Sequence, residues 1–283
     1  MKTREIVEEI LQVLKGAEVI LKGKEVEIEE KSGVGNIVTS VDKQMEEFLT
    51  ETLSNLFPDA IMIGEEAADS NCINTAEQNG LKFVIDPLDG TTNYTNGWPH
   101  TVSIGVINNN EVAAGVIYDV LSNTVYVGIK NEGVFECDMN DILVKKDIIQ
   151  PEYLQKEIKK SVITYDTPYG AEAFSFTTEA VDRLYHSGAS LKTVGPISLD
   201  VLKTALGKEN RPHDYNCAVF HAEVRAWDLC AATCILRELG GEIIDMDGNP
   251  LSAEILYDSN ARIAFIASGN KSLLRIIHAL IKN

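Results

Sequence analysis

A short segment with two carboxylates and two hydroxyls is the part of the sequence best suited to chemistry. It reads Asp86-Pro87-Leu88-Asp89-Gly90-Thr91-Thr92-Asn93 and follows the apolar run 81–85, which predicts a buried strand. We expect a tight turn here, because the segment contains a proline and a glycine. Carboxylates at the end of a strand supply the hard oxygen ligands that Mg²⁺ prefers, and neighbouring backbone amides can hold a phosphate. Metal and phosphate together indicate hydrolysis of a phosphate ester.

A structural Asx-turn is the alternative interpretation of this segment. Asp86 and Asp89 would then only accept hydrogen bonds from backbone amides. This explains one aspartate better than two, since adjacent buried carboxylates are costly unless a cation neutralises them. The sequence therefore favours a metal site.

Two earlier acidic positions can complete such a site. Glu65 and Glu66 follow the predicted strand 60–64, and one of them joins the aspartates only if this strand lies beside 81–85. Asp42 ends the string Thr39-Ser40-Val41-Asp42, which is a helix-capping pattern. The same carboxylate can instead take a proton from a metal-bound water, so both interpretations of Asp42 stay open.

A later aspartate and the histidines give weaker signals. Asp228 follows Trp227 at the start of a predicted helix, where an aspartate is ordinarily an N-cap. The histidines show no ligand spacing: His100, His186, His213, His221 and His278. The sequence contains neither a Gly-x-Ser-x-Gly elbow nor a P-loop, which argues against a serine hydrolase and an NTP-driven kinase.

The composition is that of an acidic globular protein. The 283 residues are 45% apolar and 24% charged, with a net charge of −18. This charge argues against nucleic acid or an anionic membrane as a partner. No apolar run approaches the ~20 residues of a membrane span, and the chain starts with a charged helix rather than a signal core. Five cysteines without a C-x-x-C pair favour a reducing cytoplasm, and Cys230 and Cys234 are interpreted as buried thiols on one helix face.

The spacing of apolar residues predicts helices and antiparallel strands in the first half of the chain. In the second half it predicts strands that alternate with helices. The predicted helices are 3–22, 41–56, 177–187, 198–206, 228–239 and 272–281. The predicted strands are 60–64, 81–85, 100–108, 111–120, 124–129, 161–165, 242–244 and 263–267, with a polar loop at 67–80. We expect two units, 1–148 carrying the metal site and 149–283 completing it.

Taken in order, these motifs resemble the inositol monophosphatase family of Mg²⁺-dependent, lithium-sensitive phosphatases. The resemblance covers most of the chain and rests on 36–42, 64–66, 86–94, Trp227-Asp228 and Gly240-Gly241. It implies a mixed α+β fold, a layered α-β-α-β-α sandwich of the sugar-phosphatase type, and a homodimer. This agrees with the element pattern, from which we expect an antiparallel sheet in the first half and a mixed sheet in the second.

The resemblance also implies roles for individual residues. It assigns Mg²⁺ to Glu65, Asp86, the carbonyl of Leu88, Asp89 and Asp228. It implies catalytic roles for Asp42, Thr91 and Glu65, with Asp42 and Thr91 orienting the attacking water, while the amides of Gly90 and Thr91 hold the phosphate. The substrate-binding positions that it implies are Asp89, Gly90, Thr91, Gly195, Pro196, Ile197, His221 and Asp228.

The expected activity is hydrolysis of a small sugar or polyol phosphate, like inositol 1-phosphate, by a metal-activated water without a phosphoenzyme. The partner is then a small phosphorylated metabolite. A 3′(2′),5′-bisphosphate nucleotidase or a fructose-1,6-bisphosphatase is the alternative within the same chemistry. A protein that keeps the fold but only binds phosphate or metal is the non-enzymatic alternative.

The second half departs from the family pattern in three places. The usual Gly-Ser/Thr-Ala-Ala run is replaced by Val194-Gly195-Pro196-Ile197-Ser198. The segment 207–215, with Lys208, Arg211 and His213, is longer than usual. His221 stands seven residues before Asp228, where inositol enzymes carry a sugar-binding glutamate, unless Glu223 fills that role.

Overall fold

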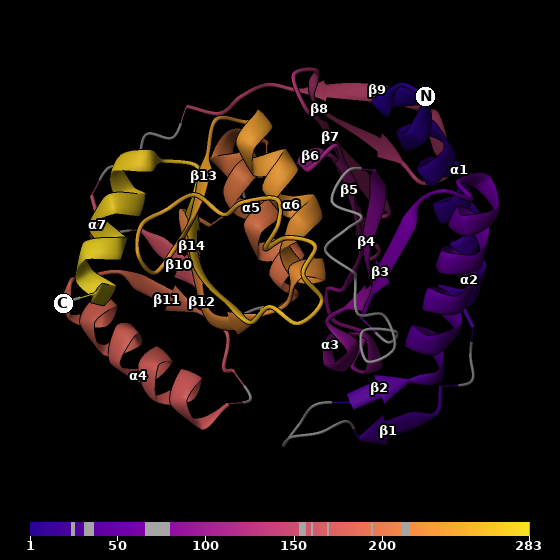
Figure 1. Cartoon of the computed structure of the whole chain (residues 1–283). Coiled ribbons are helices and arrows are strands. Elements are labelled where there is room, and N and C mark those ends of the chain that lie inside the picture. The colour runs from indigo at the N-terminus through magenta and orange to yellow at the C-terminus, as the bar shows by residue number, and fades with distance from the viewer. Residues whose placement is uncertain are drawn as a thin grey trace.

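The helices and strands of this computed structural model stack in α-β-α-β-α layers, as Figure 1 shows. The structure describes residues 1–23, 26–30, 37–65, 80–152, 157–159, 161–168, 170–193, 195–210 and 216–282. The layering confirms the sandwich that the family resemblance implied. No helix in these ranges combines the length and the apolar character needed to cross a membrane.

Two amphipathic helices form the first layer. They are α1 (Thr3–Leu21) and α2 (Ser40–Leu56), close to their predicted bounds. Ile10 of α1 and Met45 and Leu49 of α2 are fully buried and pack with Phe83 and Ile85 of the first sheet. A short antiparallel hairpin of β1 (Ile28–Glu30) and β2 (Ile37–Thr39) leads directly into α2.

The first sheet has seven strands, in the order β3-β4-β5-β6-β7-β8-β9. Their bounds are β3 Ile61–Gly64, β4 Leu81–Asp89, β5 Thr101–Asn108, β6 Glu111–Asp119, β7 Thr124–Ile129, β8 Gly133–Asp138 and β9 Asp141–Ile148. β3 pairs in parallel with β4, and every later pairing is antiparallel. The predicted meander is confirmed, whereas β8 and β9 were not predicted. The loop predicted at 67–80 lies almost entirely outside the described residues.

The prediction of a tight turn at Asp86–Asp89 was wrong. β4 continues through this segment, and its pairing with β5 shifts register between Asp86 and Asp89. Such an irregularity tolerates Pro87, which has no amide hydrogen to donate within the sheet. The chain turns one residue later, at Gly90, whose φ of 90° suits glycine, and enters the short helix α3 (Thr91–Thr95).

The second sheet has five strands, in the order β11-β10-β12-β14-β13. Their bounds are β10 Val162–Thr164, β11 Ser190–Lys192, β12 Ala218–Val224, β13 Glu242–Asp245 and β14 Ile263–Ser268. β10 is parallel to β11 and β12, while β14 is antiparallel to β12 and β13, so the sheet is mixed as expected. α4 (Ala171–His186) and α7 (Lys271–Lys282) cover one face, and α4 begins earlier than the predicted residue 177.

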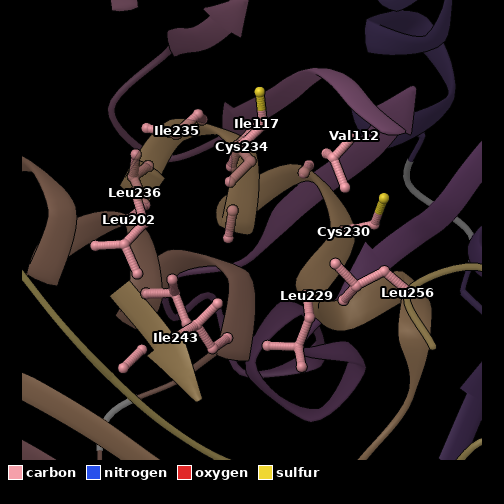
Figure 2. Close-up of a cluster of buried hydrophobic side chains, with 14 of the residues drawn as sticks. Val112, Ile117, Leu202, Leu229, Cys230, Cys234, Ile235, Leu236, Ile243 and Leu256 are labelled. Atoms are coloured by element: carbon pink, nitrogen blue, oxygen red, sulfur yellow. The ribbon is translucent and has the colours of Figure 1, made fainter. Parts of the chain in front are cut away.

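α5 (Ile197–Asn210) and α6 (Ala226–Glu238) lie between the two sheets and share one core with both (Figures 1 and 2). Cys230 and Cys234 are buried in this core, as predicted, and burial raises the pKa of both thiols. α6 ends at the predicted stop, where Gly240 has a φ of 84° and the Gly241 amide donates to the Leu236 carbonyl at 2.9 Å.

A row of three glycines lets α6 approach the first sheet closely. Gly105, Gly115 and Gly128 are direct neighbours across β5, β6 and β7. A Cβ atom on Gly115 would lie 2.1 Å from the carbonyl oxygen of Ala231, and one on Gly105 would lie 2.4 Å from the Cys230 sulfur. The glycines therefore determine how closely α6 packs against the first sheet. They also determine the position of the acidic residue in the first turn of α6.

Replacing Gly115 with alanine is therefore expected to destabilise the protein by about 1–3 kcal/mol, because the backbone of α6 cannot move aside without repacking the core. Urea unfolding measures this loss. Gly16→Ala is the matched control, since its added Cβ meets only the ring end of Phe48 and alanine favours the helix. Equal stability of Gly115→Ala and the wild type would contradict the close helix–sheet contact.

Candidate active site

The parallel pairing of β3 and β4 brings Glu65 beside Asp86. Gly64 is the register partner of Ile85, so the next residue on each strand is acidic. This is the arrangement on which the role of Glu65 depended, and it is present. Glu66 lies outside the described residues.

Asp42 serves as a helix cap and also contacts the motif. Its Oδ2 accepts hydrogen bonds from the backbone amide of Thr39 at 2.8 Å and from the Thr39 hydroxyl. Its Oδ1 accepts the hydroxyl proton of Thr91 at 2.7 Å. Asp42 is fully buried, whereas Thr91 is only partly buried. Because the Thr91 proton points to Asp42, the lone pairs of its oxygen are left to accept a hydrogen bond, as from a water molecule.

Asp86 and Asp89 both lie buried at the end of β4 but have different partners. Asp86 Oδ1 accepts the amide of Leu88 at 3.0 Å. Asp89 instead binds the start of α5, where the Ser198 amide donates to Oδ2 at 2.8 Å and the Ile197 amide donates to Oδ1 at 3.3 Å. The Ser198 hydroxyl also donates to Oδ2, at 2.5 Å. Asp89 thus links the first sheet to a helix from the second half.

The interpretation of Asp228 as an N-cap was wrong. Arg225 is the N-cap of α6, and Asp228 is the third residue of the helix, where its Oδ2 accepts a hydrogen bond from the Arg225 amide at 2.7 Å. The N-cap position and the position of Asp228 are about one helical turn apart, and apolar spacing alone does not determine at which residue a helix begins. The Asp228 side chain also interacts with that of Asp86.

The acidic side chains raise one another's pKa values. Burial raises the pKa of Asp86 well above its ordinary value, and the nearby charges of Glu65, Asp89 and Asp228 raise it further. Burial also raises the pKa of Asp228, and the charge of Asp89 adds to the effect. Burial raises the pKa of Asp89 to about 7, although the hydrogen bonds from Ser198 oppose this shift. These four acidic residues form one electrostatic cluster, which we call the acidic cluster: Glu65, Asp86, Asp89 and Asp228.

The side chains of the acidic cluster do not form a complete coordination shell for a metal ion. Among the residues that the structure describes, no three carboxylate, imidazole or thiol side chains already have the arrangement needed to hold a metal ion. The donors are nevertheless all oxygen atoms, the type that divalent hard cations bind.

The segment around Gly195 lies against the turn at Gly90. A Cβ atom on Gly90 would be 3.0 Å from Pro196, and one on Gly195 would be 3.2 Å from the side-chain nitrogen of Asn93. Ile197 contacts Asp89 through its amide. Gly195, Pro196 and Ile197 thus lie next to the motif, and their role in substrate binding stays a prediction. Val194 is outside the described residues.

The two candidates for the sugar-binding position have different surroundings. His221 is buried on β12 and stacks on Phe265 with ring centroids 5.9 Å apart, and burial lowers its pKa to about 4. Within the described part of the chain its Nδ1 has no hydrogen-bond partner. Glu223 forms an ion pair with Arg262. Arg211 and His213 of the long segment lie outside the described residues, while Lys208 belongs to α5.

Sequence reasoning missed Ser198 and Thr101 as part of the site. The Ser198 hydroxyl lies 2.7 Å from that of Thr101, the register partner of Asp89 on β5. The signal was available in the string 194–198, whose final serine stands where the family pattern has alanine. Its importance depends on a contact between distant segments, which the local pattern does not contain.

Comparison with known proteins places this site in a family. The model of the inositol monophosphatase family matches residues 3–281. Inositol monophosphatase 1 of Bos taurus is 29% identical over 255 residues, covering 88% of this chain and 83% of the relative. Nus factor SuhB of Haemophilus influenzae is 30% identical over 219 residues, covering 77% and 74%.

Solved structures share the fold. The extragenic suppressor protein SuhB from Bartonella henselae superposes with a TM-score of 0.79 at 20% identity, covering 99% of both chains. An IMPase/NADP phosphatase complexed with Mg²⁺ and phosphate gives a TM-score of 0.79 at 22% identity, covering 98% of this chain and 95% of that one. With the family model matched over nearly its whole length, the chain belongs to the inositol monophosphatase family, a family of phosphatases.

Proposed function

We propose that the protein is a Mg²⁺-dependent phosphomonoesterase that hydrolyses a small sugar or polyol phosphate. The observation that carries this proposal is the hydrogen bond from Thr91 to the buried Asp42, directly beside the acidic cluster. A protein that only bound phosphate or metal would have no need of a water-orienting pair. Its presence favours an enzyme.

The residues present fit a divalent metal. Burial and mutual repulsion raise the pKa values of Asp86, Asp89 and Asp228, and a bound cation would remove this cost by neutralising the charge. The ligands would be Glu65, Asp86, the Leu88 carbonyl, Asp89 and Asp228. A bound Mg²⁺ supplies Lewis acidity: it lowers the pKa of a water and stabilises the charge on phosphate and leaving group.

The protein groups then have separate tasks. Thr91 accepts a hydrogen bond from the attacking water and passes its own proton toward Asp42, which makes Asp42 the proton-accepting carboxylate. The Gly90 and Thr91 amides hold the phosphate in the turn that the positive φ of Gly90 creates. We assign no phosphoenzyme, because the arrangement orients a water rather than a side-chain nucleophile.

The substrate class follows from the relatives and from the second half of the chain. Solved neighbours include an inositol monophosphate-bound SaIMPase-II and an IMPase/NADP phosphatase complexed with NADP and Ca²⁺. In this chain His221 is neutral at pH 7, and Glu223 is engaged by Arg262. His221 has no carboxylate to offer to ring hydroxyls, and Oε1 of Glu223 is already paired with Arg262. This favours a polyol or sugar monophosphate other than inositol 1-phosphate.

A side-by-side assay tests the proposed activity. Phosphate release is measured with Mg²⁺ from inositol 1-phosphate, fructose 1,6-bisphosphate, 3′-phosphoadenosine 5′-phosphate, NADP and a panel of sugar monophosphates, with and without lithium. We expect turnover of at least one monophosphate that Mg²⁺ supports and lithium inhibits. Tight phosphate binding without turnover of any ester would instead show a binding protein, and preference for a bisphosphate would support the alternative enzymes.

Asp89→Asn is expected to lower Mg²⁺-dependent turnover by more than about 100-fold, because loss of a direct ligand costs more than loss of a supporting contact. Steady-state kinetics measure the loss, and circular dichroism confirms that the fold is retained. Asp182→Asn on the exposed face of α4 is the matched control and should keep wild-type turnover. Wild-type activity in Asp89→Asn would remove the metal assignment.

The metal-free protein is expected to lose stability as the pH rises from about 4 to about 7. The pKa of Asp89 moves from an ordinary 3.8 to about 7 on folding, so the folded state holds a proton that the unfolded chain has released. That contribution is complete below pH 4 and is lost as the pH passes 7.

Thermal unfolding with EDTA and with Mg²⁺ across this range measures the effect. Added Mg²⁺ should make the decline of Tm with rising pH smaller, and the Asp89→Asn substitution should do the same. A metal-free Tm that stays constant or rises over the same interval would contradict the raised pKa.

A further inference from the structure

We propose that Ser198 and Thr101 are positioning residues, which orient Asp89 so that only one of its oxygens is available to the metal or substrate. This inference rests on the proposed metal site and adds two residues to which the sequence motifs assigned no role. Neither hydroxyl is assigned a contact with the reacting groups. Both act through Asp89.

The direction of the hydrogen bonds follows from the chemistry of the groups. A carboxylate that binds a cation is ionised and only accepts hydrogen bonds, so in the metal-bound state the Ser198 hydroxyl, 2.5 Å away, donates to Asp89 Oδ2. Having used its proton there, Ser198 Oγ must accept from the Thr101 hydroxyl, 2.7 Å away. The three side chains therefore form a chain of hydrogen bonds that runs from Thr101 through Ser198 to Asp89. We call this chain the relay.

The relay joins parts of the chain that are far apart in sequence. Thr101 lies opposite Asp89 on the neighbouring strand β5, whereas Ser198 belongs to the first turn of α5. Thr101 and Ser198 are fully buried, and Asp89 is 7% exposed. Buried hydrogen bonds to a charged group are strong and directional, so the relay resists rotation of the carboxylate.

The two oxygens of Asp89 are left unequal. Oδ2 accepts both the amide and the hydroxyl of Ser198, at 2.8 and 2.5 Å. Oδ1 accepts one longer bond, from the Ile197 amide at 3.3 Å. Since Oδ2 is occupied by two donors, Oδ1 is the oxygen left to bind a cation or a substrate hydroxyl.

Four variants test the relay. Ser198→Ala removes the donor to Asp89, Thr101→Val removes the donor to Ser198 at nearly constant volume, and Thr101→Ser keeps that donor. Ser161→Ala is the matched control, because Ser161 is equally buried and donates at 2.6 Å to the backbone carbonyl of Glu157, just before the second sheet's strand β10. Each variant is assayed for the Mg²⁺ concentration giving half-maximal activity, and for the rise in Tm that Mg²⁺ or Mn²⁺ produces without substrate.

We expect Ser198→Ala to raise the half-saturating Mg²⁺ concentration about tenfold, as loss of a group supporting a metal ligand does, and to reduce the metal-induced Tm rise. Thr101→Val should shift both in the same direction by a smaller factor, and Thr101→Ser should restore them. Ser161→Ala should lower the metal-free Tm but leave the metal response unchanged. A purely structural role for Ser198 would produce that same pattern.

The inference is overturned if Ser198→Ala and Thr101→Val keep the wild-type metal response, or if the wild type shows no metal-induced Tm rise. Failure of the proposed function looks different. The wild type would then bind metal, and the variants would weaken that binding, while no phosphate ester was hydrolysed.

Discussion

The fold holds four acidic side chains together, two of which, Asp86 and Asp89, are buried. Such an arrangement is unfavourable by itself, since burial and mutual repulsion both oppose ionisation, as the raised pKa values of Asp86 and Asp228 show. The structure tolerates it because each carboxylate is tied to a rigid element. A cation that neutralises the cluster therefore couples the stability of the protein to its proposed activity.

The members of the site come from three layers of the sandwich. The parallel pairing of β3 with β4 contributes Glu65, the start of α2 contributes Asp42, and the first turn of α6 contributes Asp228. The glycine row under α6 and the contact of Asp89 with α5 set the distances between these layers. Packing far from the chemistry thus determines how closely the carboxylates approach.

The sequence predicted the parts of this arrangement that depend on local pattern. Apolar spacing located α1, α2 and most strands, and the string 86–93 located the segment that carries two residues of the acidic cluster. The pattern could not reveal the register shift that keeps β4 extended through Pro87, since that depends on pairing with β5. It also missed the relay through Ser198, because a contact between residues more than 100 positions apart leaves no periodic trace.

Calorimetric titration of the metal-free protein with Mg²⁺, in two buffers of different ionisation enthalpy at pH 7, tests the central claim most directly. If the cation neutralises the acidic cluster, binding must expel the protons that the raised pKa of Asp89 retains at this pH. We predict binding that releases protons and is lost in Asp89→Asn. The absence of binding at millimolar Mg²⁺, or binding without proton release, would contradict the account.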